Sequence, residues 1–394
     1  MKILIHAHEF NIKEGGPCTK RMKSFAEYFV ECGHEVTIIT SSHNKINEKI
    51  DLDIKYKIQY SYSTKNIKGS NLKRLINNGV FGITSFFKAM FKVKKVDVVI
   101  TTSPPPLISI FGYLIAKIKR AKLIYDVRDI WPDVALEMES FKEGSIYYKA
   151  FKFIANFMYK KADYISTVSP RKVEKIKGYC KGIDKVVYVP NGLDDGFLEF
   201  EENNEVIDKY NIKDKFTIVY IGNVGFAQNL DAMVELAKEN ADDLKIQFIV
   251  FGEGTYKNKL EEQIKEANLN NILVAGRIDY ENVYTVLKYS KVSFVSLKNT
   301  KMLDSIPTKM FDALSVGCPV LLLAKGDSCD ILHESELGES AESVEELKEK
   351  FSYMISNYEK YEEKKDKAIE YIKQNYSRKN IAEKFEREVI NNDK

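Results

Sequence analysis

The chain is poor in cysteine, proline and long apolar runs. Its five cysteines are scattered over 394 residues with no Cys-x-x-Cys pair, which argues against a disulfide framework and a cysteine zinc site. No apolar run approaches the roughly 18–20 residues of a membrane-spanning helix. The opening MKILIHAHEF lacks the apolar stretch of a signal peptide. We therefore expect a cytoplasmic protein.

The composition that remains is that of a globular protein with an uneven charge distribution. Apolar residues make up 44% of the chain, and the length predicts two domains. Residues 1–190 carry 33 basic and 18 acidic side chains, whereas residues 191–394 carry 27 and 39. The first half is therefore expected to attract anions. The alternative is that the halves merely have differently solvated surfaces.

Short apolar runs alternate with longer amphipathic stretches along the whole chain. Strands are expected at 2–6, 35–40, 96–101, 123–126, 164–168, 185–189, 217–221, 245–251, 271–275, 292–296 and 319–323. Helices are expected between them, notably at 17–32, 230–239, 256–267 and 308–316. This alternation predicts an α/β fold with two doubly wound parallel sheets, in residues 1–190 and 191–375. The last helix, about 376–394, could be free or pack on the first domain.

Ligands of such sheets bind beyond the carboxyl ends of the strands, so the loops there are the candidate sites. Three glycine turns occupy such loops. They offer Gly15 and Gly16, then Gly222, Asn223, Gly225 and Gln228, then Gly252 and Gly254. Backbone amides at glycine turns can approach a phosphate closely, although ordinary turns would look the same. None forms the G-x-G-x-x-G dinucleotide motif.

The segment LDSIPTKMFDALSVGCPV places two aspartates around the start of an expected helix. Pro307 suits the first helical position, and the free amides near Pro307, Thr308 and Lys309 would form an anion site. Asp304 would precede that site, and Asp312 would lie one turn into the helix. The alternative is a solvated helix capped by Ser305 or Asp304.

A second charged cluster, YDVRDIWPD, follows the expected strand at 123–126. Asp129 lies where a carboxylate could face a ligand, and Arg128 could contact an acceptor. Arg128 could instead pair with Asp126 or Asp133. The five histidines show no metal-ligand spacing beyond His6 and His8, so no metal site is expected.

Two basic stretches are interleaved with aromatic residues. Residues 65–95 contain eight Lys or Arg and no acidic residue, with five Phe or Met among them, and 147–161 is similar. Such stretches suit an anionic membrane surface. The alternative for each is a helix with a core-facing aromatic stripe. No nucleic-acid-binding motif occurs.

The order of several short motifs resembles family 4 retaining glycosyltransferases of the GT-B fold. The motifs are GHEVTIIT, TTSPPP, DVRDIWP, ADYISTVSP, VPNGLD, YIGNVGFAQNLD, FIVFGEG and IPTKMFDALSVGCPV. The resemblance is greatest to bacterial enzymes that build O-antigen or capsule on a lipid carrier. It implies two facing Rossmann-like domains with an interdomain cleft, in which residues 1–190 bind the acceptor and 191–375 the donor.

The resemblance also implies roles for particular residues. Asp304 would hold the donor sugar and Asp312 the ribose, where relatives carry glutamates. Relatives place Arg and Lys after the glycine turn at Gly222, and this chain does not, so Lys309 would neutralise the diphosphate, with Arg277 in reserve. Asp129 matches a His or Asp close to the reacting sugar. No cofactor and no divalent metal are implied.

The expected activity is retaining transfer of an N-acetylated or deoxy sugar from a nucleotide sugar, commonly UDP-linked, to a lipid-linked saccharide at the inner face of the plasma membrane. Two alternatives remain at this point. A UDP-sugar 2-epimerase also uses two α/β domains but needs no membrane. A degenerate transferase would only bind a lipid or a partner.

Overall fold

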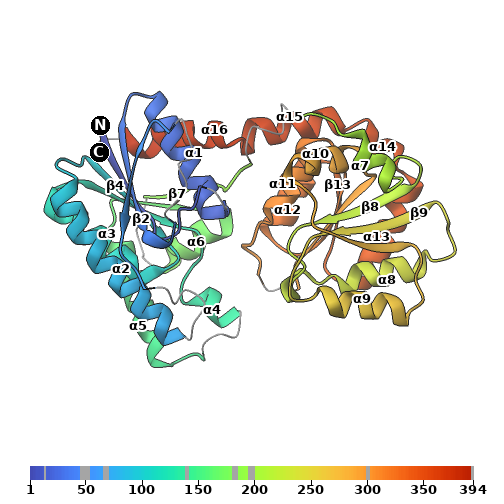
Figure 1. The fold of residues 1–394 in the computed structure, drawn as a ribbon, viewed down its shortest axis with the longest axis horizontal. Helices are drawn as coiled ribbons and strands as arrows, with labels where there is room; N and C mark the ends of the chain where they lie inside the picture. Colours follow the sequence, from blue (N-terminus) through green and yellow to red (C-terminus); the bar gives the residue numbers. More distant parts are fainter. Residues whose placement is uncertain are drawn as a thin grey trace. The chain divides into compact units, whose positions relative to one another are not determined.

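The computed structural model describes residues 1–12, 15–44, 54–64, 71–137, 142–179, 185–193, 200–298 and 302–391. It forms two compact units (Figure 1). Unit 1 is Met1–Asn191 with Arg378–Lys394, and unit 2 is Gly192–Ser377. Among all residues that the structure describes, none of the helices has the length and hydrophobicity that a membrane-spanning helix requires.

Unit 1 is built on a parallel seven-stranded sheet in the order β3-β2-β1-β4-β5-β6-β7. The strands are β1 (Lys2–His6), β2 (Glu35–Ser41), β3 (Lys57–Ser61), β4 (Val98–Ser103), β5 (Lys122–Val127), β6 (Tyr164–Thr167) and β7 (Val186–Tyr188). The helices are α1 (Pro17–Glu31), α2 (Asn71–Lys92), α3 (Pro106–Lys119), α4 (Asp133–Glu137), α5 (Ile146–Lys161), α6 (Pro170–Tyr179) and α16 (Arg378–Phe385).

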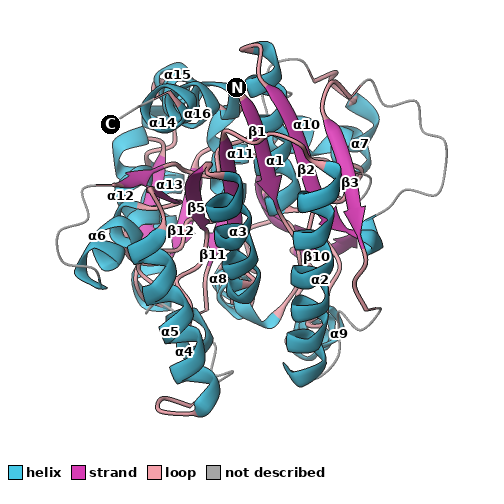
Figure 2. Ribbon diagram, turned by 90° about the vertical axis from the view of Figure 1, so that its left-hand side faces the viewer, coloured by secondary structure: helices cyan, strands magenta, loops and turns pink. Residues whose placement is uncertain are grey.

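Successive side chains of a strand point to opposite faces of a sheet. Because consecutive residues of β1 are apolar, both faces of this sheet are apolar. Ile3 and Ile5 of β1 pack in one core with α1 and α16, where Phe25 contacts Phe385 with ring centroids 4.9 Å apart. Leu4 packs in the other core, which α2, α3 and α5 cover. Figure 2 shows α2 and α3 running alongside each other over the strands. The sheet is therefore doubly wound.

Unit 2 repeats the design with a parallel six-stranded sheet in the order β10-β9-β8-β11-β12-β13. The strands are β8 (Phe216–Ile221), β9 (Ile246–Phe251), β10 (Ile272–Gly276), β11 (Val292–Ser296), β12 (Val320–Leu323) and β13 (Gly338–Ala341). The helices are α7 (Asn204–Lys209), α8 (Asp231–Glu239), α9 (Lys257–Glu266), α10 (Tyr280–Tyr289), α11 (Thr308–Ser315), α12 (Asp327–Ser335), α13 (Val344–Ser356), α14 (Glu359–Glu362) and α15 (Lys365–Tyr376).

Two strands, β3 and β13, are not predicted by the sequence patterns. Both lie at an edge of their sheet, and their sequences, KIQYS and GESA, lack a run of apolar residues. An edge strand buries less of its surface than a central one, so it needs no continuous apolar pattern. The parallel α/β architecture of both units is as the sequence predicts.

Candidate functional site

The glycine turns after β8 and β9 pack directly against each other. Gly222 N donates to Phe251 O at 2.9 Å, and Val224 N donates to Glu253 O at 2.9 Å. A Cβ at Gly252 would lie 1.8 Å from Gly222 O, and one at Gly254 would lie 2.1 Å from Val224 O. Backbone packing within unit 2 therefore already accounts for Gly252 and Gly254, whatever ligand binds there.

Lys309 reaches this pair of turns from α11, because β8 and β11 are neighbours in the sheet. Its Nζ donates to Tyr220 Oη at 2.8 Å and lies 4.1 Å from the centre of the Tyr220 ring. A Cβ on Gly222 would be 3.2 Å from Nζ. The structure thus brings the Lys309 ammonium to the end of β8, beside the turn expected to hold phosphate.

Burial perturbs the Lys309 ammonium. Desolvation lowers the pKa of Lys309 to about 8, and the nearby Asp312 carboxylate partly opposes this shift. The Tyr220 hydroxyl accepts from Lys309 and donates to Asn223 O at 2.6 Å. Burial raises the pKa of Tyr220, so this hydroxyl stays protonated. The cation is held by a neutral partner and would gain from an arriving anion.

The first turn of α11 differs from the expectation. The helix begins at Thr308, as the expected range 308–316 has it, but Pro307 is its N-cap, with φ −66° and ψ 119°, and not a residue of its first turn. The N-cap position therefore belongs to Pro307, which makes no side-chain hydrogen bond there, and not to Ser305 or Asp304 as proposed. The alternative of a solvated helix is also wrong, because Met310, Phe311 and three further residues of α11 are buried.

The two aspartates lie on either side of this helix start. Asp304 is 5% exposed and lies in the turn that follows β11. Asp312 is half-buried in α11, close enough to Lys309 to influence its charge. Both carboxylates therefore belong to the same end of the unit 2 sheet as Lys309.

Other donor candidates are arranged less closely. A Cβ on Gly225 would lie 2.6 Å from Asn223 Nδ2 and 3.0 Å from Gln228 Oε1, so the three residues share one turn. Gln228 Oε1 is buried and has no hydrogen-bond partner in the described part of the chain. Arg277 follows β10 at the sheet edge and is exposed.

In unit 1, Gly15 and Gly16 form the predicted turn before α1, while the preceding Glu14 lies outside the described residues. Gly16 is the N-cap of α1 with φ 108°, and no atom of the residues that the structure describes lies within 4 Å of where its Cβ would be. The left-handed backbone favours glycine here, and the space beside it is open.

Arg128 and Asp129 follow β5, as predicted, but their partners differ from the alternative weighed above. Arg128 Nε donates to Thr102 Oγ1 at 3.2 Å, and its NH2 group donates to Pro104 O at 3.1 Å. Asp126 instead pairs with Arg21 of α1 at 2.8 Å, with both side chains at most 1% exposed. Arg128 is thus fixed across the ends of β4 and β5, beside a half-buried Asp129.

A cavity of about 300 Å³ lies at the same end of the unit 1 sheet, which the sequence patterns missed. It is lined by His8, Glu9, Arg74, Leu75, Asn77, Asn78, Pro104, Pro105, Pro106, Trp131, Tyr147 and Phe151. The Trp131 and Phe151 rings meet edge to face at 5.2 Å. The only Trp of the chain, next to charged residues, was the one available signal.

His8 is a buried polar group in the lining of this aromatic cavity. Its Nε2 is 2.9 Å from Asn77 Oδ1, and its Nδ1 is buried without a hydrogen-bond partner among the residues described. Burial lowers the pKa of His8, although the Asn77 bond opposes this, so the ring is neutral at pH 7. Nε2 then carries the proton and Nδ1 is an acceptor.

The basic helices have an apolar core face and a second apolar face toward solvent. On α2, Phe81 is buried, whereas Phe87 and Phe91 are 52% and 79% exposed. On α5, Met158 is buried and Phe153 is 71% exposed. A core-facing stripe alone therefore does not explain these helices; residues 65–70 lie outside the described residues.

Across the described ranges, no group of three or more His, Cys, Asp or Glu could hold a metal ion. The candidate acidic groups of the donor site are Asp304 and Asp312, and the candidate basic group beside them is Lys309.

Two family models match the chain. Glycosyltransferase Family 4 matches residues 19–197, and Glycosyl transferases group 1 matches residues 202–375, so most of the chain is covered. The chain belongs to glycosyltransferase family 4. It is therefore a glycosyltransferase with a GT-B fold, and the epimerase alternative is set aside.

Individual relatives agree with this family. WcaI of Escherichia coli (strain K12), named for colanic acid biosynthesis, is 25% identical over 88% of this chain and 90% of its own. Anabaena HepE, solved in complex with UDP, aligns with a TM-score of 0.72 at 13% identity over 98% of this chain and 99% of its own. WaaG, a glycosyltransferase of lipopolysaccharide biosynthesis, aligns with a TM-score of 0.71 at 14% identity, over 98% of both chains. The structural likenesses show the shared fold.

Proposed function

We propose that this family 4 glycosyltransferase moves a sugar, with retention of configuration, from a UDP-linked donor to a lipid-linked saccharide in bacterial surface polysaccharide synthesis. The observation that carries the proposal is the position of the Lys309 ammonium, 2.8 Å from Tyr220 Oη and against the Gly222 turn. The names of WcaI, WaaG and the UDP complex of HepE support this choice of pathway and nucleotide.

In the proposed donor site, the diphosphate lies between the first turn of α11 and Lys309. Free helix amides and a cation that is short of water both favour an anion. Asp312, one turn into α11, would accept hydrogen bonds from the ribose hydroxyls. Asp304 would accept from hydroxyls of the donor sugar. No divalent metal is needed to neutralise the diphosphate in this arrangement.

The proposed chemistry uses the leaving group as the base. The bond between the anomeric carbon and the diphosphate oxygen breaks while Lys309 stabilises the charge that develops on the phosphate. The acceptor hydroxyl forms the new bond from the same face, and its proton passes to the departing phosphate oxygen. Asp129 keeps the role that the resemblance implies, which is to orient the sugar or stabilise positive charge on its ring.

Unit 1 is the proposed acceptor side. The aromatic cavity offers Trp131, Tyr147 and Phe151 as flat surfaces for sugar rings, and His8 Nδ1 as an acceptor for a hydroxyl. Gly15, Gly16 and Arg128 lie after strands of the same sheet. Arg74, which lines this cavity together with Glu9, offers a guanidinium that suits a phosphate of a lipid carrier.

The exposed apolar faces of α2 and α5 are the proposed membrane contact. Their exposed side chains include Leu72, Ile76, Ile83, Phe87, Phe91, Ile146 and Phe153, and basic residues flank them. Apolar side chains beside lysines match the acyl chains and anionic headgroups of a bilayer. This contact would keep unit 1 at the membrane where a lipid-linked acceptor lies.

The test is transfer by an Asp304→Ala variant, followed by NMR of the product's anomeric configuration in the native enzyme. We expect the α-linked donor to give an α-linked product, and we expect the variant to lose transfer while its circular dichroism spectrum stays native. Asp330→Ala is the matched control, because Asp330 is an exposed side chain in the first turn of α12. Full activity of Asp304→Ala, or inversion by the native enzyme, would contradict the proposal.

A further inference from the structure

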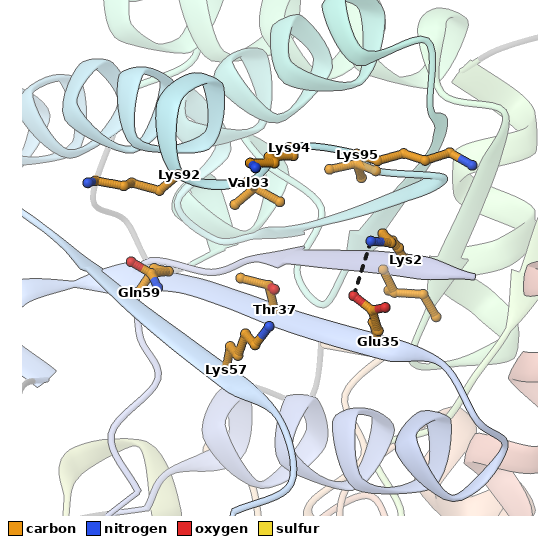
Figure 3. A pocket seen from close by; sticks show the side chains of 11 residues that line it. Lys2, Glu35, Thr37, Lys57, Gln59, Lys92, Val93, Lys94 and Lys95 are labelled. Atoms are coloured by element: carbon orange, nitrogen blue, oxygen red, sulfur yellow. Dashed lines mark ion pairs between the residues drawn. The ribbon is translucent and has the colours of Figure 1, made fainter.

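A second hollow in unit 1 lies at the opposite ends of the strands from the aromatic cavity. It encloses about 250 Å³ between the amino ends of β1, β2 and β3 and the segment that follows α2 (Figure 3). Its charged lining residues are Lys2, Glu35, Lys57, Lys92, Lys94 and Lys95. We call it the lysine pocket. Neither donor nor acceptor site as proposed above uses it.

The lysine pocket has an excess of positive charge. Glu35 is the one carboxylate among its lining residues, and it pairs with Lys2 at 3.3 Å. Lys95 pairs with Asp97 at 3.3 Å, outside the pocket lining. Lys57, Lys92 and Lys94 have no ion pair within the described ranges. Ammonium groups gathered around one hollow repel each other, so an anion would be stabilised there.

Different elements supply these ammonium groups. Lys57 starts the edge strand β3, whereas Lys92 ends α2 and Lys94 lies two residues further. Figure 3 shows the Lys92 and Lys94 side chains on one side of the hollow and Lys57 on the other, with Thr37 and Gln59 between. Lys119 holds the end of α2 in place, because its Nζ donates to Val93 O at 2.6 Å. The pocket is therefore built by the tertiary structure, not by one basic helix.

The exposed aromatic residues of α2 adjoin this pocket in sequence. Phe91 directly precedes Lys92 and is 79% exposed, and its ring stacks on Phe87 with centroids 6.3 Å apart. A surface that pairs exposed Phe side chains with unpaired lysines matches the boundary between acyl chains and anionic headgroups. It does not match a free soluble anion, which has no use for exposed aromatic rings.

We propose that the lysine pocket binds the phosphate group of an anionic phospholipid headgroup, with Lys57, Lys92 and Lys94 as its ligands, while Phe87 and Phe91 enter the acyl region. This inference rests on the membrane contact of the proposed function and adds to it the lipid chemistry and the residues. It separates lipid recognition, at the amino ends of the strands, from acceptor recognition at their carboxyl ends.

The test is flotation of the full-length protein with vesicles of phosphatidylcholine, alone or with about 30% phosphatidylglycerol. Lys57→Gln/Lys94→Gln should weaken binding to the anionic vesicles by about fivefold for each lysine removed. The control is Lys55→Gln/Lys23→Gln, which removes the same charge from two exposed lysines of unit 1 that do not line the pocket. We expect the control to change binding less than twofold.

The outcomes separate the two levels of the proposal. If the native protein does not float with anionic vesicles, the membrane contact and the lysine pocket proposal both fail. If it floats but the pocket variant and the control bind equally, the pocket proposal alone is overturned. Titration with glycerol phosphate, without vesicles, covers the other source: specific binding to the pocket with equal flotation of both variants would assign it to a free phosphorylated metabolite and also overturn the proposal.

Discussion

Units 1 and 2 each contain their own parallel sheet with helices on both faces, but the side chains at the loops and surfaces of the two units differ. Unit 1 has basic helices with exposed Phe side chains and a cavity lined by aromatic rings. Unit 2 has two glycine turns that pack against each other and a lysine of α11 whose ammonium lies beside the first of them, at Gly222. The comparison teaches that the sheets fix where loops end, while a few loop residues decide which ligand each sheet can take.

The two units also differ in how they hold a partly or fully buried cation, Lys309 in unit 2 and Arg21 in unit 1. In unit 1, Arg21 is fully neutralised: it pairs with Asp126 and donates to Pro190 O at 2.6 Å. In unit 2, Lys309 donates to a neutral hydroxyl and its pKa is lowered to about 8. The first arrangement stabilises a fold, and the second leaves a cation ready for an anionic ligand.

The largest expected effect is on stability, and it comes from breaking the buried ion pair between Arg21 and Asp126. Arg21→Met should reduce the free energy of unfolding of unit 1 by about 3–5 kcal/mol, because it leaves the Asp126 carboxylate buried without its cation. Chemical denaturation measures this. Lys23→Met, on the same helix but 46% exposed, is the control and should change stability little. Equal stability of the two variants would show that the pair does not support the fold.

In unit 2, Lys309→Met should impair ligand binding and leave the stability of the fold intact, the reverse of what Arg21→Met should do. It should weaken nucleotide diphosphate binding roughly 10- to 100-fold, as expected for a lost charge-assisted hydrogen bond. The melting temperature should stay the same or rise, because burial disfavours the ammonium. Calorimetry and thermal unfolding together check this. A stable variant with unchanged affinity would remove Lys309 from the donor site.

The pH dependence of nucleotide affinity is a second test of whether the Lys309 ammonium contacts the diphosphate. A bound diphosphate raises the Lys309 pKa above its free value of about 8, so binding takes up a proton in that range. Affinity should therefore fall as pH rises through 8, up to tenfold per unit. The Lys309→Met variant should show no such fall. A flat profile for the native protein between pH 7 and 9 would contradict the assignment.

The smallest expected effect concerns the membrane face of unit 1. Phe153→Ser removes one side chain that is 71% exposed, so it should weaken vesicle binding a few-fold and leave stability unchanged. Sedimentation with anionic vesicles measures this, and Phe226→Ser, on the exposed turn after β8 in unit 2, is the control. If the control lost more vesicle binding than Phe153→Ser, the membrane contact would lie on unit 2, and its assignment to unit 1 would be wrong.

The sequence predicted the central strands because they are buried on both faces and therefore continuously apolar, as in Val98–Ser103. It missed β3 and β13, whose edge positions allow polar residues. It located Lys309, Asp304 and Asp312 because one helix start holds all three. It gave the start of this helix correctly at Thr308 but assigned Pro307 to the first turn instead of the N-cap, since proline suits both positions.

The rest of the site depends on residues that are far apart in the chain. The aromatic cavity joins His8, Asn77, Trp131 and Phe151, which no local pattern connects. The Arg21–Asp126 pair spans two elements, and its charges look like ordinary surface residues in the sequence. The lysine pocket needs both β3 and the end of α2. Such groupings follow from the order of strands in the sheet, which the sequence patterns do not give.

The most direct test of the donor site is calorimetric titration of the protein with UDP, GDP and ADP in the presence of EDTA. We predict metal-independent binding that is selective for UDP and lost in Asp312→Ala, because that carboxylate lies one turn from Lys309 on α11. Binding of none of the three nucleotides, or equal binding by native protein and Asp312→Ala, would contradict a donor site at α11. The chain would then keep the fold of a glycosyltransferase without its donor site.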